Sequence, residues 1–124
     1  MIPTDTGSDH ELEWGWRLHG EDGTGQPIEI TVGETELGHA VSGVTIGRHP
    51  ALCEYVIDDG GVSHRHFRLS RGADGLLVED VNSLNGTRLD GHPLAPFEPV
   101  IVRDGQRLTV GRVSLAIARL ADPQ

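Results

Sequence analysis

The chain has 124 residues, which suits one domain, and 10 arginines with no lysine against 19 acidic residues give a formal net charge of −9. Its 17 glycines and 7 prolines exclude all-α folds and α/β folds with regular crossover helices. The short apolar runs and the negative charge predict no membrane and no nucleic acid as partners. A single cysteine, Cys53, favours a reducing compartment, so we expect a cytoplasmic protein.

The order of apolar and polar residues along the chain predicts a tail followed by many short strands. Residues 1–13 have little to bury and are predicted to form a flexible acidic tail before a domain over residues 14–121. Alternating apolar and polar residues between Gly, Pro, Asn and Asp turns are typical of half-buried strands, and Trp14 and Trp16 supply the largest expected core side chains. The expected strands are 14–18, 28–32, 44–46, 55–57, 67–70, 76–81, 88–89, 100–102, 107–110 and 113–117. This pattern predicts an all-β fold, a β-sandwich of about ten strands.

The net charge is distributed unevenly along the sequence. Residues 1–47 carry −8, residues 48–71 carry +1 and residues 72–124 carry −2. The middle segment also contains three histidines, so it is locally basic within an acidic protein. Such a segment either decorates the solvent face of strands or binds an anionic ligand, and charge alone leaves both interpretations open.

Three polar clusters fall between predicted strands, at Gly47–Pro50, Gly60–His66 and Asp80–Thr87. Loops at the ends of sandwich strands gather into one surface, where binding residues concentrate. Together the clusters supply a guanidinium, hydroxyls, imidazoles, amides and glycine-rich backbone. An arginine fork matches two phosphate oxygens, and hydroxyls and backbone N–H groups add further donors. The clusters therefore predict an anion-binding site.

In this order and spacing, the motifs Gly47-Arg48, Ser63-x-x-His66 and Ser83-x-Asn85-Gly86-Thr87 resemble those of the forkhead-associated (FHA) domain family. The resemblance covers about residues 14–120 and includes a closing strand at 107–111. It implies a β-sandwich of about 10–11 strands that binds phosphothreonine in Ser/Thr-kinase signalling, without enzymatic activity, cofactor or metal. The implied partner is a phosphothreonine-containing protein, either a Ser/Thr kinase or its substrate. A composition with arginine but no lysine fits a bacterial source.

The resemblance also implies a role for each motif residue. Arg48 would hold the phosphate, and the Ser63 hydroxyl and the His64 backbone N–H would add donors. The residues expected to contact the ligand backbone or to line the neighbouring loop are Asn85, Ser83, Leu84 and Arg88. The residues expected to be structural are Gly47, His66 and Gly86. Family members often have Thr or Ser where this chain has Leu84, so one side-chain donor is missing and we expect weaker binding.

Other interpretations remain open at this level. The residues that could form a zinc site are His49, Cys53, His64 and His66, but their spacing lacks the tight local pairs of such sites. The residues that could form a hydrolase triad are Ser63, His66 and Asp80, although no nucleophile-elbow motif is present. Cys53 is expected to be a core residue rather than a reactive thiol. A further alternative is a phosphate-independent scaffold or oligomerisation module on an FHA fold.

Overall fold

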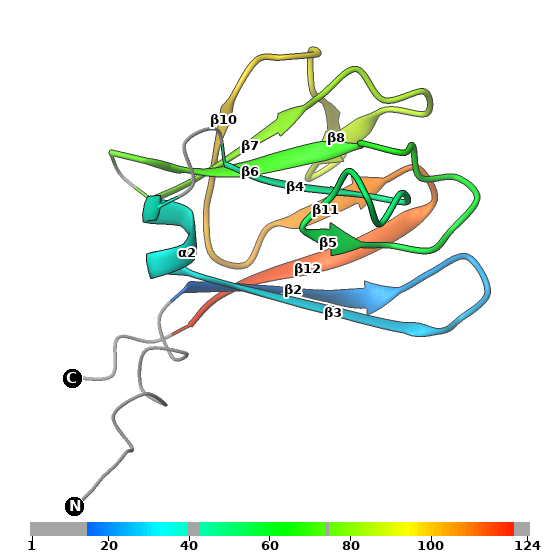
Figure 1. Ribbon diagram of the computed structural model, residues 1–124, viewed down its shortest axis with the longest axis horizontal. Coiled ribbons are helices and arrows are strands. Elements are labelled where there is room, and N and C mark those ends of the chain that lie inside the picture. Colours follow the sequence, from blue (N-terminus) through cyan, green and yellow to red (C-terminus); the bar gives the residue numbers. More distant parts are fainter. Residues whose placement is uncertain (1–14, 40–42, 74, 121–124) are drawn as a thin grey trace, which may run out of the picture.

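The computed structural model describes residues 15–39, 43–73 and 75–120, which form two β-sheets (Figure 1). These residues contain eleven strands and one short helix, so the predicted all-β sandwich of about 10–11 strands is confirmed. The predicted tail at 1–13 and Trp14 lie outside the described residues. None of the helical segments in the described part of the chain is long and apolar enough to cross a membrane.

The first sheet carries the loops that matter for the site. Its strands, in order, are β10 (Val100–Val102), β7 (Gly75–Asp80), β6 (Phe67–Gly72), β4 (Val44–Gly47) and β5 (Tyr55–Val56). β4 and β5 are parallel, and the other neighbours are antiparallel. In β6, Phe67 and Leu69 are buried while the alternate residues are half-exposed, as the two-residue period of a strand requires. This alternation made the central strands predictable from the sequence.

The second sheet closes the other side of the core. Its strands, in order, are β3 (Pro27–Gly33), β2 (Gly15–Glu21), β12 (Val113–Leu120), β11 (Arg107–Val110), β8 (Thr87–Leu89) and β9 (His92–Pro93). All of its neighbouring strands are antiparallel. Trp16 is buried on β2 as expected, within a core made mainly of Val, Leu and Ile. The strands therefore present one apolar face inward and one polar face outward.

Two elements were absent from the sequence-based prediction. Helix α2 (Glu34–His39) has six residues including a glycine, too few to show a helical period, yet its Leu37 is buried in the core. Strand β9 has two residues, both exposed, and so shows no apolar alternation. Figure 1 places α2 at one end of the sandwich, while the β4–β5, β5–β6 and β7–β8 loops lie at the opposite end. The three motif clusters are therefore gathered at one end.

Candidate functional site

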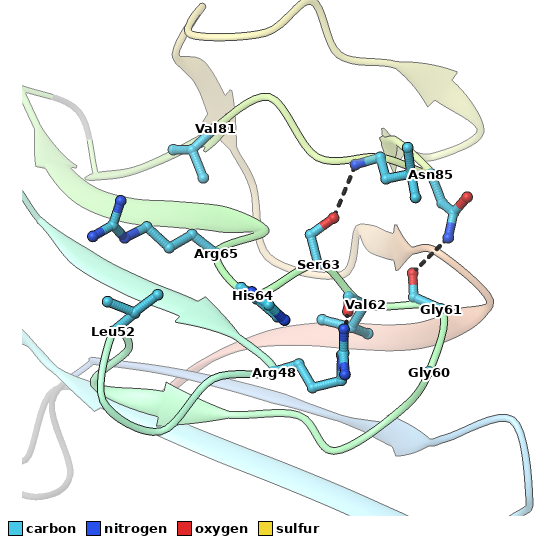
Figure 2. A pocket seen from close by; sticks show the side chains of 11 residues that line it. Arg48, Leu52, Gly60, Gly61, Val62, Ser63, His64, Arg65, Val81 and Asn85 are labelled. Carbon is cyan, nitrogen blue, oxygen red and sulfur yellow. Dashed lines mark hydrogen bonds between the residues drawn. The ribbon is translucent and has the colours of Figure 1, made fainter.

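The three motif loops surround a hollow of about 430 Å³ (Figure 2). Five of the residues singled out from the sequence line it: Arg48, Ser63, His64, Leu84 and Asn85. They come from the loops that follow β4, β5 and β7, which meet at this end of the sandwich. A hollow built from loops on a rigid sandwich is a typical place for a ligand.

Arg48 follows β4 directly and is anchored close to its backbone. Its main-chain N–H donates to the carbonyl of Ser63 at 2.9 Å, and its Nε–H donates to the carbonyl of Val62 at 2.9 Å. The Nε bond fixes the side chain and leaves the two terminal nitrogens exposed as a fork. Gly47 permits this approach, because a Cβ atom there would collide with the His64 carbonyl oxygen.

Ser63 lies at the centre of the hollow and is half-buried. Its Oγ accepts a hydrogen bond from the backbone N–H of Leu84 at 2.9 Å, shown as a dashed line in Figure 2. Accepting this bond leaves the hydroxyl proton free to donate elsewhere. The same bond draws the β7–β8 loop against the β5–β6 loop, so the donors of two motifs share one surface.

His66 is fully buried between those two loops. Its Nδ1 accepts the backbone N–H of Ser63 at 3.0 Å, so Nε2 carries the proton and donates to the carbonyl of Gly86 at 2.9 Å. Burial lowers the pKa of His66 below its usual value, because the imidazolium would lose its hydration. Gly86 has a φ of 85°, a conformation that favours glycine.

Asn85 and Ser83 make different kinds of contact in the β7–β8 loop. The Asn85 Nδ2 donates to the carbonyl of Gly61 at 2.9 Å across the hollow, which leaves the amide oxygen for a ligand (Figure 2). The Ser83 hydroxyl donates to Asp80 Oδ1 at 2.5 Å and accepts the backbone N–H of Gly86 at 3.0 Å. Ser83 therefore shapes the turn of the loop.

The buried carboxylate of Asp80 holds the β7–β8 loop in place by accepting hydrogen bonds from it, a role that the sequence analysis did not predict. It is 2 % exposed, and its carboxylate accepts the backbone N–H groups of Asn82 and Ser83 and the hydroxyls of Ser83 and Thr87. Burial alone would raise its pKa, yet the pKa lies below the usual aspartate value, because hydrogen bonds from Ser83 and Thr87 stabilise the carboxylate. The available signal was an aspartate at a strand end, because such a side chain often accepts the backbone N–H two residues on, as Asp80 does from Asn82.

A second carboxylate, that of Asp59, joins three loops beside the hollow. It is 4 % exposed and accepts the backbone N–H groups of Gly23 and Gly61, each at 2.8 Å, and the Nε–H of Arg112 at 3.0 Å. These donors, led by Gly23, lower the pKa of Asp59. Because Gly61 accepts the Asn85 amide, Asp59 also positions the partner of a candidate ligand residue.

The structure places two arginines, Arg88 and Arg65, differently from what the sequence predicted. Arg88 lies exposed on β8, and the hollow does not include it. Arg65, which belongs to the Gly60–His66 cluster but was given no role of its own, lines the hollow together with Leu52 and Val81. The surplus positive charge over residues 48–71 was the signal that could have identified it.

Comparison with known proteins agrees with the motif pattern and the architecture. The model of the FHA domain family matches residues 44–111, more than half of the chain. This chain belongs to the FHA domain family. FHA domains are interaction modules, and relatives bind phosphothreonine peptides. The N-terminal FHA domain of Saccharomyces cerevisiae Rad53 was solved with such a peptide; it has a TM-score of 0.65 to this chain and 27% identity, and the match covers 85% of this chain and 93% of that domain.

Curated relatives of this FHA domain are longer proteins. The serine/threonine-protein kinase RAD53 of S. cerevisiae is 38% identical over 69 residues, 54% of this chain and 8% of the relative. The oxoglutarate dehydrogenase inhibitor of Corynebacterium jeikeium is 35% identical over 69 residues, 56% of this chain and 45% of the relative. The chain thus spans less than half the length of these relatives.

The FHA domain geometry also bears on the metal and hydrolase interpretations. Within the described residues, no three His, Cys, Asp or Glu side chains cluster so that they could hold a metal ion. The Cys53 thiol donates to the carbonyl of His64 at 3.0 Å, and burial raises its pKa, so the thiolate is disfavoured. His66 Nδ1 already accepts the backbone N–H of Ser63, so it is unable to accept the proton of the Ser63 hydroxyl as a hydrolase triad would require.

Proposed function

We propose that this chain is a phosphothreonine-dependent protein-interaction module that binds its ligand in the hollow at the loop end of the sandwich. The observation that carries the proposal is the lining of that hollow. The lining includes both Arg48 and Ser63, and none of the described residues that form it has a carboxylate side chain. In a chain of net charge −9, a carboxylate-free hollow with an exposed guanidinium fork suits a phosphate.

The phosphate would be held by three kinds of donor. The terminal nitrogens of Arg48 would make a bidentate contact, because its Nε is committed to Val62. The Ser63 hydroxyl would donate a second contact, and the backbone N–H of His64 would supply a third. Leu84 offers no side-chain donor, which we expect to cost about 0.5–1.5 kcal/mol relative to a hydroxyl.

The rest of the site would hold the peptide and keep the loops in place. The free oxygen of the Asn85 amide would bind the ligand main chain beside the phosphothreonine, while its nitrogen stays on Gly61. Ser83 would position the β7–β8 loop through Asp80. The residues that complete the structural frame in this proposal are Gly47, His66 and Gly86. Leu84 lines the hollow beside Asn85, and Arg88 lies outside it.

The proposal extends to partner and setting. We expect the ligand to be a phosphothreonine-containing protein, either a Ser/Thr kinase or its substrate, in bacterial cytoplasmic signalling. The similarity to a yeast protein kinase and to a corynebacterial protein supports this setting. We expect no catalysis, no cofactor, and neither nucleic acid nor membrane as ligand. We place the domain at residues 14–121.

Calorimetric titration with a phosphothreonine peptide and its unphosphorylated twin tests the function. We expect the wild type to bind only the phosphorylated form, and Arg48→Ala to lose this binding. Arg103→Ala is the matched control, because Arg103 is exposed and does not line the hollow. Equal binding of both peptides would contradict the proposal and favour a phosphate-independent scaffold on the same fold.

A further inference from the structure

The longest open edge of the two sheets, among the described residues, belongs to β3. An edge strand exposes a row of backbone N–H and C=O groups that can pair with a further strand. The edge strands β5 and β9 have two residues each and β10 has three, whereas β3 has seven. Figure 1 shows β3 along the lower border of the second sheet. An added strand would therefore gain most by pairing with β3.

The hairpin that joins β2 to β3 shows which backbone groups of β3 point to the open side. The N–H of Asp22 donates to the carbonyl of Gln26 at 2.9 Å, and this pair continues the β2–β3 register by one step beyond Glu21 and Pro27. Hydrogen-bonded and non-bonded pairs alternate along antiparallel strands. The even-numbered residues of β3 therefore bond to β2, and the backbone groups of the odd-numbered residues point away from it.

These outward backbone groups of β3 have no hydrogen-bond partner within the described part of the chain. The N–H groups are those of Glu29, Thr31 and Gly33, and no bond from another element reaches them. Pro27, which has no N–H, is the first residue of the strand and also lies at an outward position. The remaining donors and acceptors form an unbroken row along the edge.

The sequence of β3 is complementary to a second, antiparallel copy of itself. When Ile30 of both copies lies on a two-fold axis, all seven residues are paired, and the odd-numbered positions match with about six main-chain hydrogen bonds. Glu29, the one charged residue of β3, then lies opposite Thr31 of the other copy, so no like charges oppose each other. Thr31 in turn lies opposite Arg17 on β2, so each acid faces a row of side chains that ends in a base.

We propose that the chain forms a homodimer by antiparallel pairing of β3 with β3 of a second copy, which joins two six-stranded sheets into one continuous sheet. One strand pair is a small interface beside the roughly 1,200–2,000 Å² of stable complexes, so the dimer is weak and forms at high protein concentration. Because β3 runs from the loop end of the sandwich to α2, the two hollows open at opposite ends of the dimer. The dimer therefore offers two separate ligand sites.

Sedimentation velocity of the full chain measures the mass, and amide hydrogen exchange followed by NMR locates the contact. We expect the mass to rise from 13.4 kDa toward twice that value as the protein concentration increases to about 1 mM. Over the same range the amides of Glu29, Thr31 and Gly33 should become protected from exchange. The amides of Ile28 and Ile30, which bond to β2, should be protected at every concentration.

Two substitutions of Thr31 separate pairing of the strands from folding of the monomer. Thr31→Pro should abolish the dimer, because proline lacks the N–H that the other copy needs. The folded monomer should keep β3, because this N–H points to the open side and is not bonded to β2. Thr31→Ala is the matched control, which keeps the N–H and should dimerise like the wild type.

Charge variants test the register and do not depend on the tolerance of β3 for proline. Thr31→Glu places an acid opposite Glu29 of the other copy and should weaken the dimer about three- to tenfold. Adding Glu29→Lys to that variant sets opposite charges against each other and should restore the dimer. Restoration requires that positions 29 and 31 face each other, as the proposed register demands.

Three results would overturn the dimer. The first is a wild type that stays monomeric up to about 1 mM. The second is self-association that Thr31→Pro retains, which would place the contact on another surface. The third is protection of the outward amides in the dilute monomer, which would show that another segment of this chain covers the edge. None of these outcomes involves a phosphopeptide, so the proposed function is tested separately.

Discussion

The backbone N–H of Ser63 donates a hydrogen bond of 3.0 Å to Nδ1 of His66 and thereby determines which ring nitrogen carries the proton. Nε2 then donates to the carbonyl of Gly86 at 2.9 Å. A proton on Nδ1 would place two N–H groups against each other and break the first bond. The contact between the two motif loops therefore depends on a neutral imidazole.

Stability should fall when the pH drops below the usual histidine range, because burial lowers the pKa of His66. Above a pH of about 6.5 the ring is neutral in both the folded and the unfolded chain, so its full contribution is present. Below that value the unfolded chain takes up a proton that the folded chain resists, and the free energy of unfolding decreases. Urea titrations between about pH 7.5 and about pH 5, above the carboxylate range, measure this loss.

Matched variants show whether His66 is responsible for that loss. His92→Gln should keep the wild-type pH dependence, because His92 is exposed on β9, whereas His66→Asn should flatten it. If His66→Asn fails to fold, NMR titration of the wild-type imidazole Cε1 proton gives the same information. Titration of His66 at or above the usual histidine pKa would contradict the prediction.

Replacing Arg48 by lysine should weaken phosphopeptide binding although the positive charge stays. Lysine lacks the planar fork and also the Nε–H that Arg48 donates to Val62. We expect a loss of about tenfold or more, measured by calorimetry, with little change in melting temperature. Arg103→Lys should bind like the wild type. An Arg48→Lys protein with undiminished affinity would show that charge alone accounts for the contact.

Leu84→Thr should strengthen phosphopeptide binding. Leu84 is 88 % exposed at the edge of the hollow, and its backbone N–H remains bonded to Ser63 Oγ whichever side chain it carries. The added hydroxyl would supply a donor for the phosphate and increase affinity by about two- to tenfold. Leu84→Val is the control, since valine is β-branched like threonine but has no hydroxyl. Equal affinities of the two variants would show that a hydroxyl at this position does not reach the phosphate.

Asp80→Asn should destabilise the domain. The buried carboxylate accepts bonds from two backbone N–H groups and from the hydroxyls of Ser83 and Thr87, and an amide nitrogen cannot accept them. We expect the free energy of unfolding to fall by about 2–3 kcal/mol in urea titrations. Asp58→Asn, at an exposed position, should change it little. Equal stability of both variants would mean that the loop does not depend on the carboxylate.

The sequence predicted those strands whose apolar residues alternate, and it failed where burial has no period. Phe67 and Leu69 show the alternation directly, and β6 follows. Leu37 is just as deeply buried, but it belongs to a six-residue helix in which one apolar contact cannot establish a pattern. Strand β9 is held by backbone pairing with β8, and both of its side chains are exposed, so no apolar alternation marks it in the sequence.

In the candidate site, too, some residues could be predicted from short sequence motifs and others could not. Arg48, Ser63 and Asn85 could be singled out because each belongs to a short motif, and all three line the hollow. Arg65 and Asp80 lie in the same polar clusters but belong to none of these motifs, so only the charge surplus over residues 48–71 and an aspartate at a strand end pointed to them. Sequence spacing does not show which way an exposed arginine points or which carboxylate becomes buried under a turn.

The carboxylate of Asp59 implies that the folding unit is longer than the stretch by which the family is recognised. Two of its three donors, Gly23 and Arg112, lie outside residues 44–111. A fragment cut to the recognised stretch would keep the Arg48 and Ser63 motifs but leave a buried anion with one backbone donor, and would remove β2, β3 and β12. Any transplant of this binding end into another protein must therefore carry both flanks with it.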